Sequence, residues 1–309
     1  MNNILVTGAT GFFGKAFIRF VLDMGVQRVC VYSRDEWKQA QMREEFDNDD
    51  RLRWFIGDVR DYQRLHRAMS GVDTVIHAAA LKRIEVGEYN PDELVKTNVN
   101  GAMNVIEAAL STKVKHVVAL STDKAASPYN AYGASKLLSE KLFLAANNIA
   151  GQGGPTFAVT RYGNVAGSTG SVIPLWRSLQ EAGAPIVVTD PDCTRFWMTS
   201  EEAVRLVFWA VGRRDMVVPD LPAYRIEDLI VAMGEKLSDA VKVDMRPGEK
   251  KHEAMLSEHE CSEFYKSDIY GYWVRGAFEF GDWPLDKPLT SDIARRMSIE
   301  ELRRGLDEL

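Results

Sequence analysis

Short apolar runs and longer polar or amphipathic segments alternate along the first half of the chain. The apolar runs have the length and β-branched content of buried strands, and they occupy residues 4–6, 29–32, 52–56, 73–77, 117–120 and 158–161. Helical patterns lie between them, over residues 15–24, 37–50, 61–69, 91–110 and the stretch that carries Tyr132 and Lys136. Such alternation is typical of a parallel sheet covered by helices on both faces. It predicts an α/β fold with a Rossmann-type, doubly wound sheet.

The regular alternation ends near residue 163. We expect a first domain over residues 1–163 and a smaller mixed lobe over residues 164–309, with segments that return to the sheet. Within this lobe the pattern predicts a helix from Pro174 to Ala182 and a charged amphipathic helix from Asp292 onward.

Composition excludes several classes of protein. The chain has 309 residues, of which 46% are hydrophobic, so it can bury a sizeable core. A net charge of −6 gives no basic footprint for nucleic acid. The three cysteines and five histidines lack the spacing of a disulfide framework or a metal site, and no apolar run reaches the roughly 18 residues of a membrane span. We expect a cytoplasmic protein with no metal and no nucleic-acid or membrane partner.

A glycine-rich loop joins the first strand to the first helix. Its glycines have GxxGxxG spacing: Gly8 permits a tight turn, Gly11 a close approach to pyrophosphate, and Gly14 close helix–strand packing. The N-terminus of the helix would bind the pyrophosphate through free N–H groups. The loop therefore predicts a dinucleotide site with contacts from Thr7, Gly8, Thr10, Gly11, Phe12, Phe13 and Gly14.

The end of the second strand favours NADP. Ser33 and Arg34 offer a hydroxyl and a guanidinium that suit a ribose 2′-phosphate. Asp35 and Glu36 follow directly, and an acid at this place prefers NAD, so NAD stays open as the second choice. Residues 1–163 are thus expected to be an NADP-binding Rossmann domain.

The next two strands end in further candidates. Asp58 can accept from an adenine amino group, and small residues after the fourth strand let the backbone approach a cofactor at the edge where α/β sheets bind ligands. His77, inside an apolar run, is expected to be a core residue with a satisfied nitrogen. The candidates for cofactor contacts here are Asp58, Val59, Ala78, Ala79 and Lys82.

The fifth predicted strand leads into the richest set of reactive side chains. Tyr132 and Lys136 are four residues apart, so they share one helical face. A cationic neighbour favours the phenolate, so Tyr132 can act as a base closer to neutrality than its ordinary pKa of about 10 allows. Thr122, Asp123 and Lys124, at the end of the strand, offer a hydroxyl, an acid and a second amine.

Eight motifs, in order along the chain, carry a resemblance to a known family. They are TGATGFFG, VYSRDE, GDVRD, HAAALK, STDKAASPYNAYGASK, TRYGNVAGS, TRFWMT and RPGEKKHE. The combination resembles the extended short-chain dehydrogenase/reductases. More narrowly, it resembles the inverting nucleotide-sugar 4,6-dehydratases of the CapD-like polysaccharide-biosynthesis group, whose known substrate is UDP-N-acetylglucosamine. The resemblance is weakest after about Met255.

The resemblance implies a dehydration in which NADP is recycled. Hydride leaves carbon 4 while Tyr132, its pKa lowered by Lys136, takes the hydroxyl proton. A base removes the carbon 5 proton, water leaves from carbon 6, and hydride returns to carbon 6. The product would be a 4-keto-6-deoxy sugar for surface-glycan or nonulosonic-acid biosynthesis.

Asp123 matches the family's proposed acid and Lys124 its proposed base, which inverts carbon 5; Thr122 completes the catalytic set. For Lys124 to be a base, its pKa must fall through burial or through the cation Lys136.

The same resemblance implies a substrate site. Lys82 and Asn164 would contact cofactor or sugar, and Arg195 and Glu249 the nucleotide diphosphate and base. The complete expected set is Lys82, Ser121, Thr122, Asn164, Val165, Gly167, Ser168, Thr169, Arg195, Arg246 and Glu249. Relatives usually carry a basic residue in this glycine-rich loop where the chain has Thr169, which leaves the nucleotide open.

Other functions stay open beside this one. A retaining dehydratase on a UDP-, GDP- or dTDP-sugar belongs to the same class. A nucleotide-sugar 4-epimerase would share Tyr132 and Lys136 but needs no acid and base at carbons 5 and 6. A non-catalytic NADP-binding regulator belongs to another class and would not need the whole set of reactive residues. The family habit is a homo-oligomer.

Overall fold

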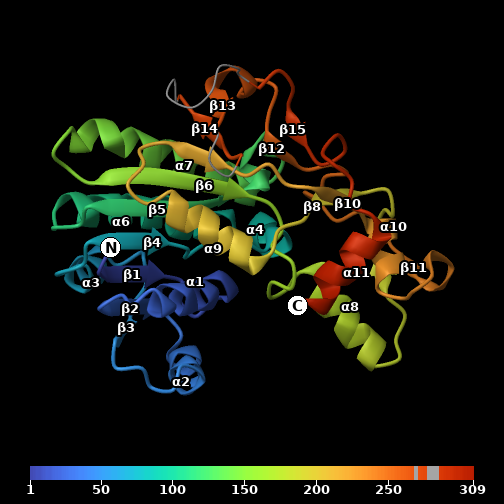
Figure 1. Cartoon of the computed structure of the whole chain (residues 1–309), viewed down its shortest axis with the longest axis horizontal. Coiled ribbons are helices and arrows are strands. Elements are labelled where there is room, and N and C mark those ends of the chain that lie inside the picture. Colours follow the sequence, from blue (N-terminus) through green and yellow to red (C-terminus); the bar gives the residue numbers. More distant parts are fainter. Residues whose placement is uncertain (268–270, 277–284) are drawn as a thin grey trace.

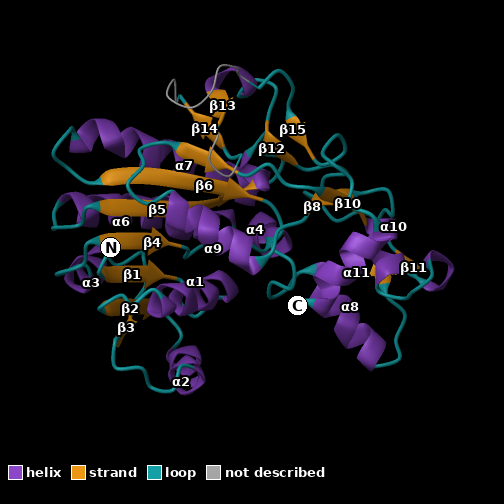
Figure 2. Cartoon of the chain, viewed as in Figure 1, coloured by secondary structure: helices purple, strands orange, loops and turns teal. Residues whose placement is uncertain are grey.

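A nine-stranded sheet forms the centre of the molecule (Figures 1 and 2). The structure is a computed structural model that describes residues 1–267, 271–276 and 285–309. In spatial order the strands are β13 (Phe264–Lys266), β14 (Trp273–Arg275), β9 (Met216–Val218), β6 (Thr156–Tyr162), β5 (His116–Thr122), β4 (Thr74–His77), β1 (Asn3–Thr7), β2 (Arg28–Ser33) and β3 (Leu52–Ile56). Strands β9 to β3 are parallel, and β14 and β13 are antiparallel additions at one edge.

The strands lie where the sequence has its apolar runs. Every residue of β4 is buried, and β5 and β6 are buried from their second residue onward, because helices cover both faces. From β1 the chain runs outward to β3, and from β4 it runs outward in the other direction, so the order reverses between β1 and β4. The predicted doubly wound α/β fold is confirmed, and its ligand crevice belongs at the carboxyl ends of these two strands.

Two layers of helices enclose this sheet (Figure 1). The helices α1 (Phe12–Asp23) and α9 (Ser200–Trp209) pack together on one face, and α3 (Tyr62–Ala68), α6 (Gly101–Leu110) and α7 (Ala131–Ala150) cover the other. Near β2 lies α2 (Glu36–Glu45), and α4 (Ile84–Tyr89), which has no counterpart among the predicted helices, follows β4. Most of the predicted helices are present with ends shifted by a few residues, because the caps rather than the hydrophobic pattern decide where a helix begins.

The helix predicted over residues 91–110 contains a π-helical segment. Its parts are α5 (Pro91–Leu94), the π segment (Val95–Asn100) and α6. The π segment buries Asn98, whose amide bonds both main-chain groups of Leu81 and the Ser135 hydroxyl at 2.9–3.0 Å. Asn98 therefore ties the loop after β4 to α7, and π segments are often found at functional sites.

The second half of the chain adds a lobe beside the carboxyl ends of the parallel strands (Figures 1 and 2). Its helices are α8 (Val172–Glu181), α10 (Ile226–Ala232) and α11 (Ile299–Asp307). Its strand pairs are β10 (Ala223–Arg225) with β8 (Thr194–Phe196), β11 (Val241–Lys242) with β7 (Val187–Val188), and β12 (Ala254–Leu256) with β15 (Leu289–Thr290). Trp176, Trp197, Leu302 and Leu306 belong to its own core.

The helix predicted from Asp292 starts only at Ile299. Ser298 and Glu301 form a capping box that fixes this start. Strands β9, β14 and β13 come from beyond residue 163 yet lie in the central sheet, and the domain boundary at residue 163 stays a prediction. Across the described ranges, no helix has both the length and the apolar composition to cross a membrane.

Candidate active site

The glycine-rich loop lies against the chain segment that follows β4. Gly8 has a φ of +67°, and a Cβ built on it would lie 2.8 Å from the Ala79 nitrogen. A Cβ on Gly14 would lie 2.4 Å from the Ala9 carbonyl oxygen, which agrees with the close packing expected there. Gly8 is therefore needed twice, for its left-handed backbone and for the contact that brings two predicted cofactor segments together.

The N-terminus of α1 is free to bind an anion. Gly11 caps it without a side-chain hydrogen bond, and its first turn carries no acidic residue. The first N–H groups of a helix have no partner within the helix and carry the positive end of its dipole. A pyrophosphate fits this loop and helix start.

His77 is the core residue that the sequence predicts. It is buried, its Nδ1 bonds Thr7 Oγ1 at 2.9 Å, and burial lowers its pKa to about 3. Thr7 Oγ1 also accepts a hydrogen bond from the Ala79 nitrogen at 3.2 Å. Thr7 therefore links the end of β1 to β4 and to the segment that follows β4.

Replacing Gly8 by alanine should weaken both folding and cofactor binding. Gly25 offers a matched control, since its φ is +80° but a Cβ there would meet nothing within 4 Å. We expect Gly25→Ala to cost about 1 kcal/mol from the backbone alone. Gly8→Ala should cost clearly more and lower the affinity for a nicotinamide dinucleotide, as measured by thermal denaturation and calorimetry. Equal effects of the two changes would show that the contact with Ala79 is unimportant.

The candidates for the adenosine end lie at the carboxyl ends of β2 and β3. Arg34 Nη1 is 3.6 Å from Asp58 Oδ2, and the Arg34 side chain is 55% exposed. Ser33 is buried and accepts from Gln39 through its hydroxyl and carbonyl. Asp35 caps α2 by accepting from the Lys38 nitrogen at 3.0 Å. The structure thus offers an exposed guanidinium here, while the neighbouring acid is engaged in a helix cap.

The reactive residues meet where β5 ends and α7 begins. The 3₁₀ turn Asp123–Ala125 follows β5, and Asn130 caps α7 by accepting from the Gly133 nitrogen at 2.7 Å. A Cβ on Gly133 would lie 2.2 Å from the Lys124 carbonyl oxygen, so α7 packs directly on this turn. This packing brings Thr122, Asp123, Lys124 and Tyr132 together. All are buried except the half-buried Lys124, and Lys136 is buried one turn further along α7.

The predicted lowering of the Tyr132 pKa is wrong for this structure. Burial raises the pKa of the phenol to about 12, with weaker opposing effects from Lys124 and the Thr122 hydroxyl. Lys136 donates to the Leu120 carbonyl at 2.7 Å, and burial lowers its own pKa to about 8 against the pull of Glu140. Tyr132 and Lys136 do lie on one helix as predicted, but burial affects the pKa of Tyr132 more than the neighbouring charges do.

The predicted lowering of the Lys124 pKa is also wrong, but for the opposite reason. Its Nζ lies 3.1 Å from Asp123 Oδ1 and 3.2 Å from Glu253 Oε1. Burial alone would lower the pKa of Lys124, but these two carboxylates outweigh it and raise the pKa above its ordinary value. Burial, reinforced by Glu253, raises the pKa of Asp123 despite the nearby ammonium. An acid that holds its proton longer than usual suits Asp123 as a proton donor.

A second ionic network, centred on the buried Arg161, adjoins this group through Ser121. Arg161 on β6 binds both carboxylate oxygens of Glu140 on α7 at 2.6–2.9 Å and both oxygens of Glu260 at 2.9–3.0 Å. It also donates to the Met255 carbonyl at 2.9 Å. Ser121, a predicted substrate contact, donates its hydroxyl to Glu140 at 2.5 Å, which leaves only its lone pairs for a ligand.

The predicted sugar loop lies near Lys82. Lys82 Nζ donates to the Thr169 carbonyl at 3.3 Å, so two candidates from distant motifs meet. Asn164 Oδ1 is buried and has no hydrogen-bond partner among the described residues. Asn164 and Val165 line a small cavity, whose other walls include Trp197 and Tyr224. Gly167 and Ser168 form the adjoining turn, in which Gly167 has a φ of +71°.

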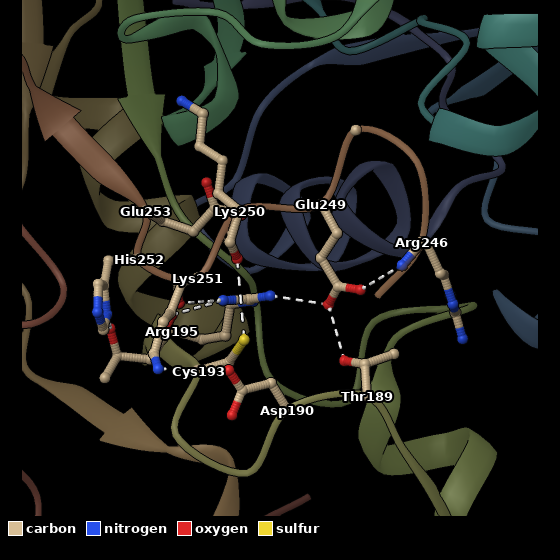
Figure 3. Close-up of polar contacts among 12 residues, drawn as sticks. Thr189, Asp190, Cys193, Arg195, Arg246, Glu249, Lys250, Lys251, His252 and Glu253 are labelled. Carbon is tan, nitrogen blue, oxygen red and sulfur yellow. Dashed lines mark hydrogen bonds and ion pairs between the residues drawn. The ribbon is translucent and has the colours of Figure 1, made fainter. Parts of the chain in front are cut away.

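The predicted nucleotide contacts form a separate cluster in the lobe. Figure 3 shows the Arg195 guanidinium between the Glu249 carboxylate, at 2.9 Å, and the Lys251 carbonyl, at 3.1 Å. Arg246 contacts Glu249 through its main-chain nitrogen and carbonyl, and its side chain points away and pairs with Glu85 at 3.1 Å. The structure therefore brings Arg195 and Glu249 together and places the Arg246 side chain elsewhere.

Residues 246–253 form a strap from this cluster to the reactive group. Lys250 Nζ donates to the carbonyls of Ala126 and Ser127 at 3.1 and 2.6 Å, and Ser127 has a left-handed φ of +47°. Glu253, at the end of the strap, reaches Lys124. Sequence reasoning missed both contacts, and the only signal was the RPGEKKHE motif itself. In the described part of the chain, no three His, Cys, Asp or Glu side chains are grouped to hold a metal ion.

Fold and site together define a Rossmann-type, extended short-chain dehydrogenase/reductase. A family model described as "Polysaccharide biosynthesis protein" matches residues 4–272, and the chain belongs to this family.

Two relatives illustrate the family. The chain is 46% identical over 286 residues to "UDP-N-acetylglucosamine 4,6-dehydratase (inverting)" of Campylobacter jejuni, which covers 91% of this chain and 85% of the relative. It is 38% identical to "UDP-glucose 4-epimerase" of Rickettsia akari, over 99% of this chain and 95% of the relative.

Two solved structures are similar. Pen from Bacillus thuringiensis superimposes with a TM-score of 0.93 and 34% identity, covering 100% of this chain and 98% of Pen. DesIV of Streptomyces venezuelae, a dTDP-glucose 4,6-dehydratase solved with NAD bound, has a TM-score of 0.70 and 26% identity, covering 80% of this chain and 86% of DesIV.

Proposed function

We propose that this protein is an NADP-dependent 4,6-dehydratase of UDP-N-acetylglucosamine that inverts carbon 5 and makes a 4-keto-6-deoxy sugar. The observation that carries the proposal is the group in which Asp123 and Lys124 lie beside Tyr132. Dehydration needs an acid and a base in addition to the hydroxyl-activating tyrosine, and this group contains all three. Similarity to the inverting dehydratase of C. jejuni supports the choice of sugar and stereochemistry.

The residues of the crevice fit a nicotinamide dinucleotide. The loop at Gly8 and the open start of α1 would hold the pyrophosphate, and Arg34 the 2′-phosphate of NADP. When bound, the nicotinamide accepts hydride from carbon 4 and returns it to carbon 6. The chain's own residues move the protons.

Each proton transfer has a residue in place. Tyr132 takes the proton of the carbon 4 hydroxyl, for which its phenolate needs the cations Lys124 and Lys136 close by. Asp123, with its raised pKa, donates to the leaving carbon 6 hydroxyl. Lys124 gives its own proton to solvent, to which its side chain is 18% exposed, and the neutral amine then removes the carbon 5 proton. Arg195 and Glu249 bind the nucleotide, and Lys82, Asn164 and the loop that follows line the sugar.

Incubation of the protein with UDP-N-acetylglucosamine and NADP⁺ in deuterium oxide tests the function. We expect NMR spectra to show a 4-keto-6-deoxy product with deuterium at an inverted carbon 5. An unchanged sugar nucleotide, or deuterium with retained configuration, would contradict the proposal.

The second candidate is a 4-epimerase, which the R. akari relative favours. It needs no acid and base for carbons 5 and 6, and Asp123 and Lys124 argue against it. The same NMR assay with UDP-glucose decides, since an epimerase would yield UDP-galactose without incorporating deuterium. A homo-oligomeric state and a cytoplasmic location remain predictions from the sequence.

The cofactor preference rests on Arg34. We expect the unmutated protein to bind NADP more tightly than NAD. Arg34→Ala should lower NADP affinity about 10- to 100-fold, since hydrogen bonds to a charged group are lost, and should leave NAD affinity unchanged. Arg53→Ala, an exposed arginine on the adjoining β3, is the control. Calorimetry with both cofactors is the measurement, and equal affinities in the unmutated protein would refute the preference.

A further inference from the structure

Glu253 is a buried carboxylate whose side chain has one charged contact within hydrogen-bonding range. The residue is 3% exposed, and its Oε1 lies 3.2 Å from Lys124 Nζ. Its Oε2 is buried and has no hydrogen-bond partner among the described residues. Desolvating a carboxylate is costly, so a carboxylate kept half-satisfied calls for an explanation.

The buried Glu140 and the half-buried Glu260 show what a carboxylate with a structural role looks like in this chain. Glu140 uses both oxygens, on Ser121 and Arg161. Glu260 also uses both, on Arg161 and on the main chain and hydroxyl of Ser257. Glu253 does not follow this pattern. Asp123 does not either, since its Oδ2 is also buried without a partner, and the two half-satisfied carboxylates share Lys124.

The main chain holds Glu253 in place without its carboxylate. Its nitrogen donates to Ser291 Oγ at 2.9 Å, and the Ser291 nitrogen donates to the Glu253 carbonyl at 2.8 Å. Three residues earlier, Lys250 fastens the strap to the turn at Ala126 and Ser127. The Glu253 side chain is therefore not needed to hold the strap and is available to act on Lys124.

Lys124 is the member of the group that reaches outward. Its side chain is 18% exposed, against 1% for Asp123 and 4% for Glu253. A carboxylate behind an amine fixes the direction of that amine and stabilises its positive charge. The charged or titratable groups that face Lys124 are Asp123, Glu253, Arg195, Lys250, Lys82, Tyr132 and Tyr224. Only Asp123 and Glu253 among them are acidic.

We propose that Glu253 is a positioning residue, which holds the Lys124 amine toward the substrate and controls whether that amine is charged. The role in catalysis rests on the proposed function, in which Lys124 removes the carbon 5 proton. Asp123 is itself proposed to donate its proton during the reaction. Glu253 is therefore the carboxylate that remains to set the charge of Lys124.

The test measures the charge of Lys124 directly. Acetic anhydride acylates only neutral amines, so the yield of acetylated Lys124 against pH, read by peptide mass spectrometry, gives the midpoint of its deprotonation. Glu253→Gln keeps the shape and removes the charge, and it should move the midpoint downward by about one pH unit or more. Glu260→Gln is the control, because it removes a half-buried negative charge that pairs with Arg161 and not with Lys124.

Turnover gives the second readout. If Lys124 is the base, exchange of the carbon 5 hydrogen with solvent rises with pH as Lys124 loses its proton. In Glu253→Gln this rise should move to lower pH by the same interval, while the plateau rate falls because the amine is less well placed. A structural role would lower the rate at every pH without moving the rise.

The outcomes separate the two proposals. If the unmutated protein does not dehydrate UDP-N-acetylglucosamine, the proposed function fails, while acetylation still reports on Glu253. An unchanged midpoint in folded Glu253→Gln, or an equal shift in Glu260→Gln, overturns the role of Glu253. If Glu253→Gln does not fold, Glu253→Asp decides: its carboxylate lies further from Lys124, so a smaller downward shift is expected, and no shift overturns the inference.

Discussion

Replacing Lys124 by alanine is expected to stop elimination, while oxidation at carbon 4 continues at a lower rate because Tyr132 loses one of its two supporting cations. Loss of a general base typically slows a step about 10²- to 10⁴-fold, and the first hydride transfer does not use Lys124 as its base. Reduced cofactor should therefore accumulate on the protein when UDP-N-acetylglucosamine is added. Its absorbance after rapid mixing measures the first step, and exchange of the carbon 5 hydrogen in deuterium oxide measures the second.

Lys141→Ala, an exposed lysine on α7, is the control for the loss of one positive charge. Lys124→Glu should not restore inversion, because a carboxylate at this place titrates far lower than an amine. Should Lys124→Ala exchange and dehydrate at the original rate, Lys124 is not the base, and the inference about Glu253 loses its catalytic meaning.

The change Tyr132→Phe should block the reaction one step earlier. Without the phenol oxygen nothing takes the proton of the carbon 4 hydroxyl, so bound NADP⁺ should not be reduced and turnover should fall about 10²- to 10⁴-fold. The ring stays, so the buried packing beside Thr122 is kept. Tyr129→Phe, a tyrosine that is 72% exposed in the preceding turn, should leave the rate unchanged.

Lys136→Ala tests the second residue that is proposed to act in the oxidation at carbon 4. A slower reduction of bound NADP⁺ is expected, since the cation closest in sequence to Tyr132 is removed. If Tyr132→Phe or Lys136→Ala reduced the cofactor at the unmutated rate, the assignment of the corresponding residue would be wrong.

The sequence was sufficient wherever neighbours along the chain decide the structure. Apolar runs predicted the parallel strands because each is buried between helices, and the spacing of Gly8, Gly11 and Gly14 predicted the loop before α1. His77 was correctly placed in the core because it lies inside one of these runs. Tyr132 and Lys136 were correctly placed on one helix.

What the sequence could not supply were contacts between distant segments and the effect of burial. Glu253 is 129 positions from Lys124 along the chain, and nothing in either motif shows that the two side chains meet. The pKa direction of Tyr132 was wrong because desolvation depends on the packed structure. That of Lys124 was wrong because the carboxylates of Asp123 and of the distant Glu253 outweigh its burial. Asn98 was missed because a π segment changes which helical residues point inward.

The buried guanidinium of Arg161 couples the two halves of the chain during folding. Its Nη1 has the Met255 carbonyl and Glu260 as acceptors, and both lie far beyond residue 163. A chain cut after residue 163 would lose these acceptors and also β9, the strand that pairs with β6, so an edge of the parallel sheet would be left unpaired. The first half therefore depends on the second for its stability as well as for its substrate site, and the two should unfold cooperatively.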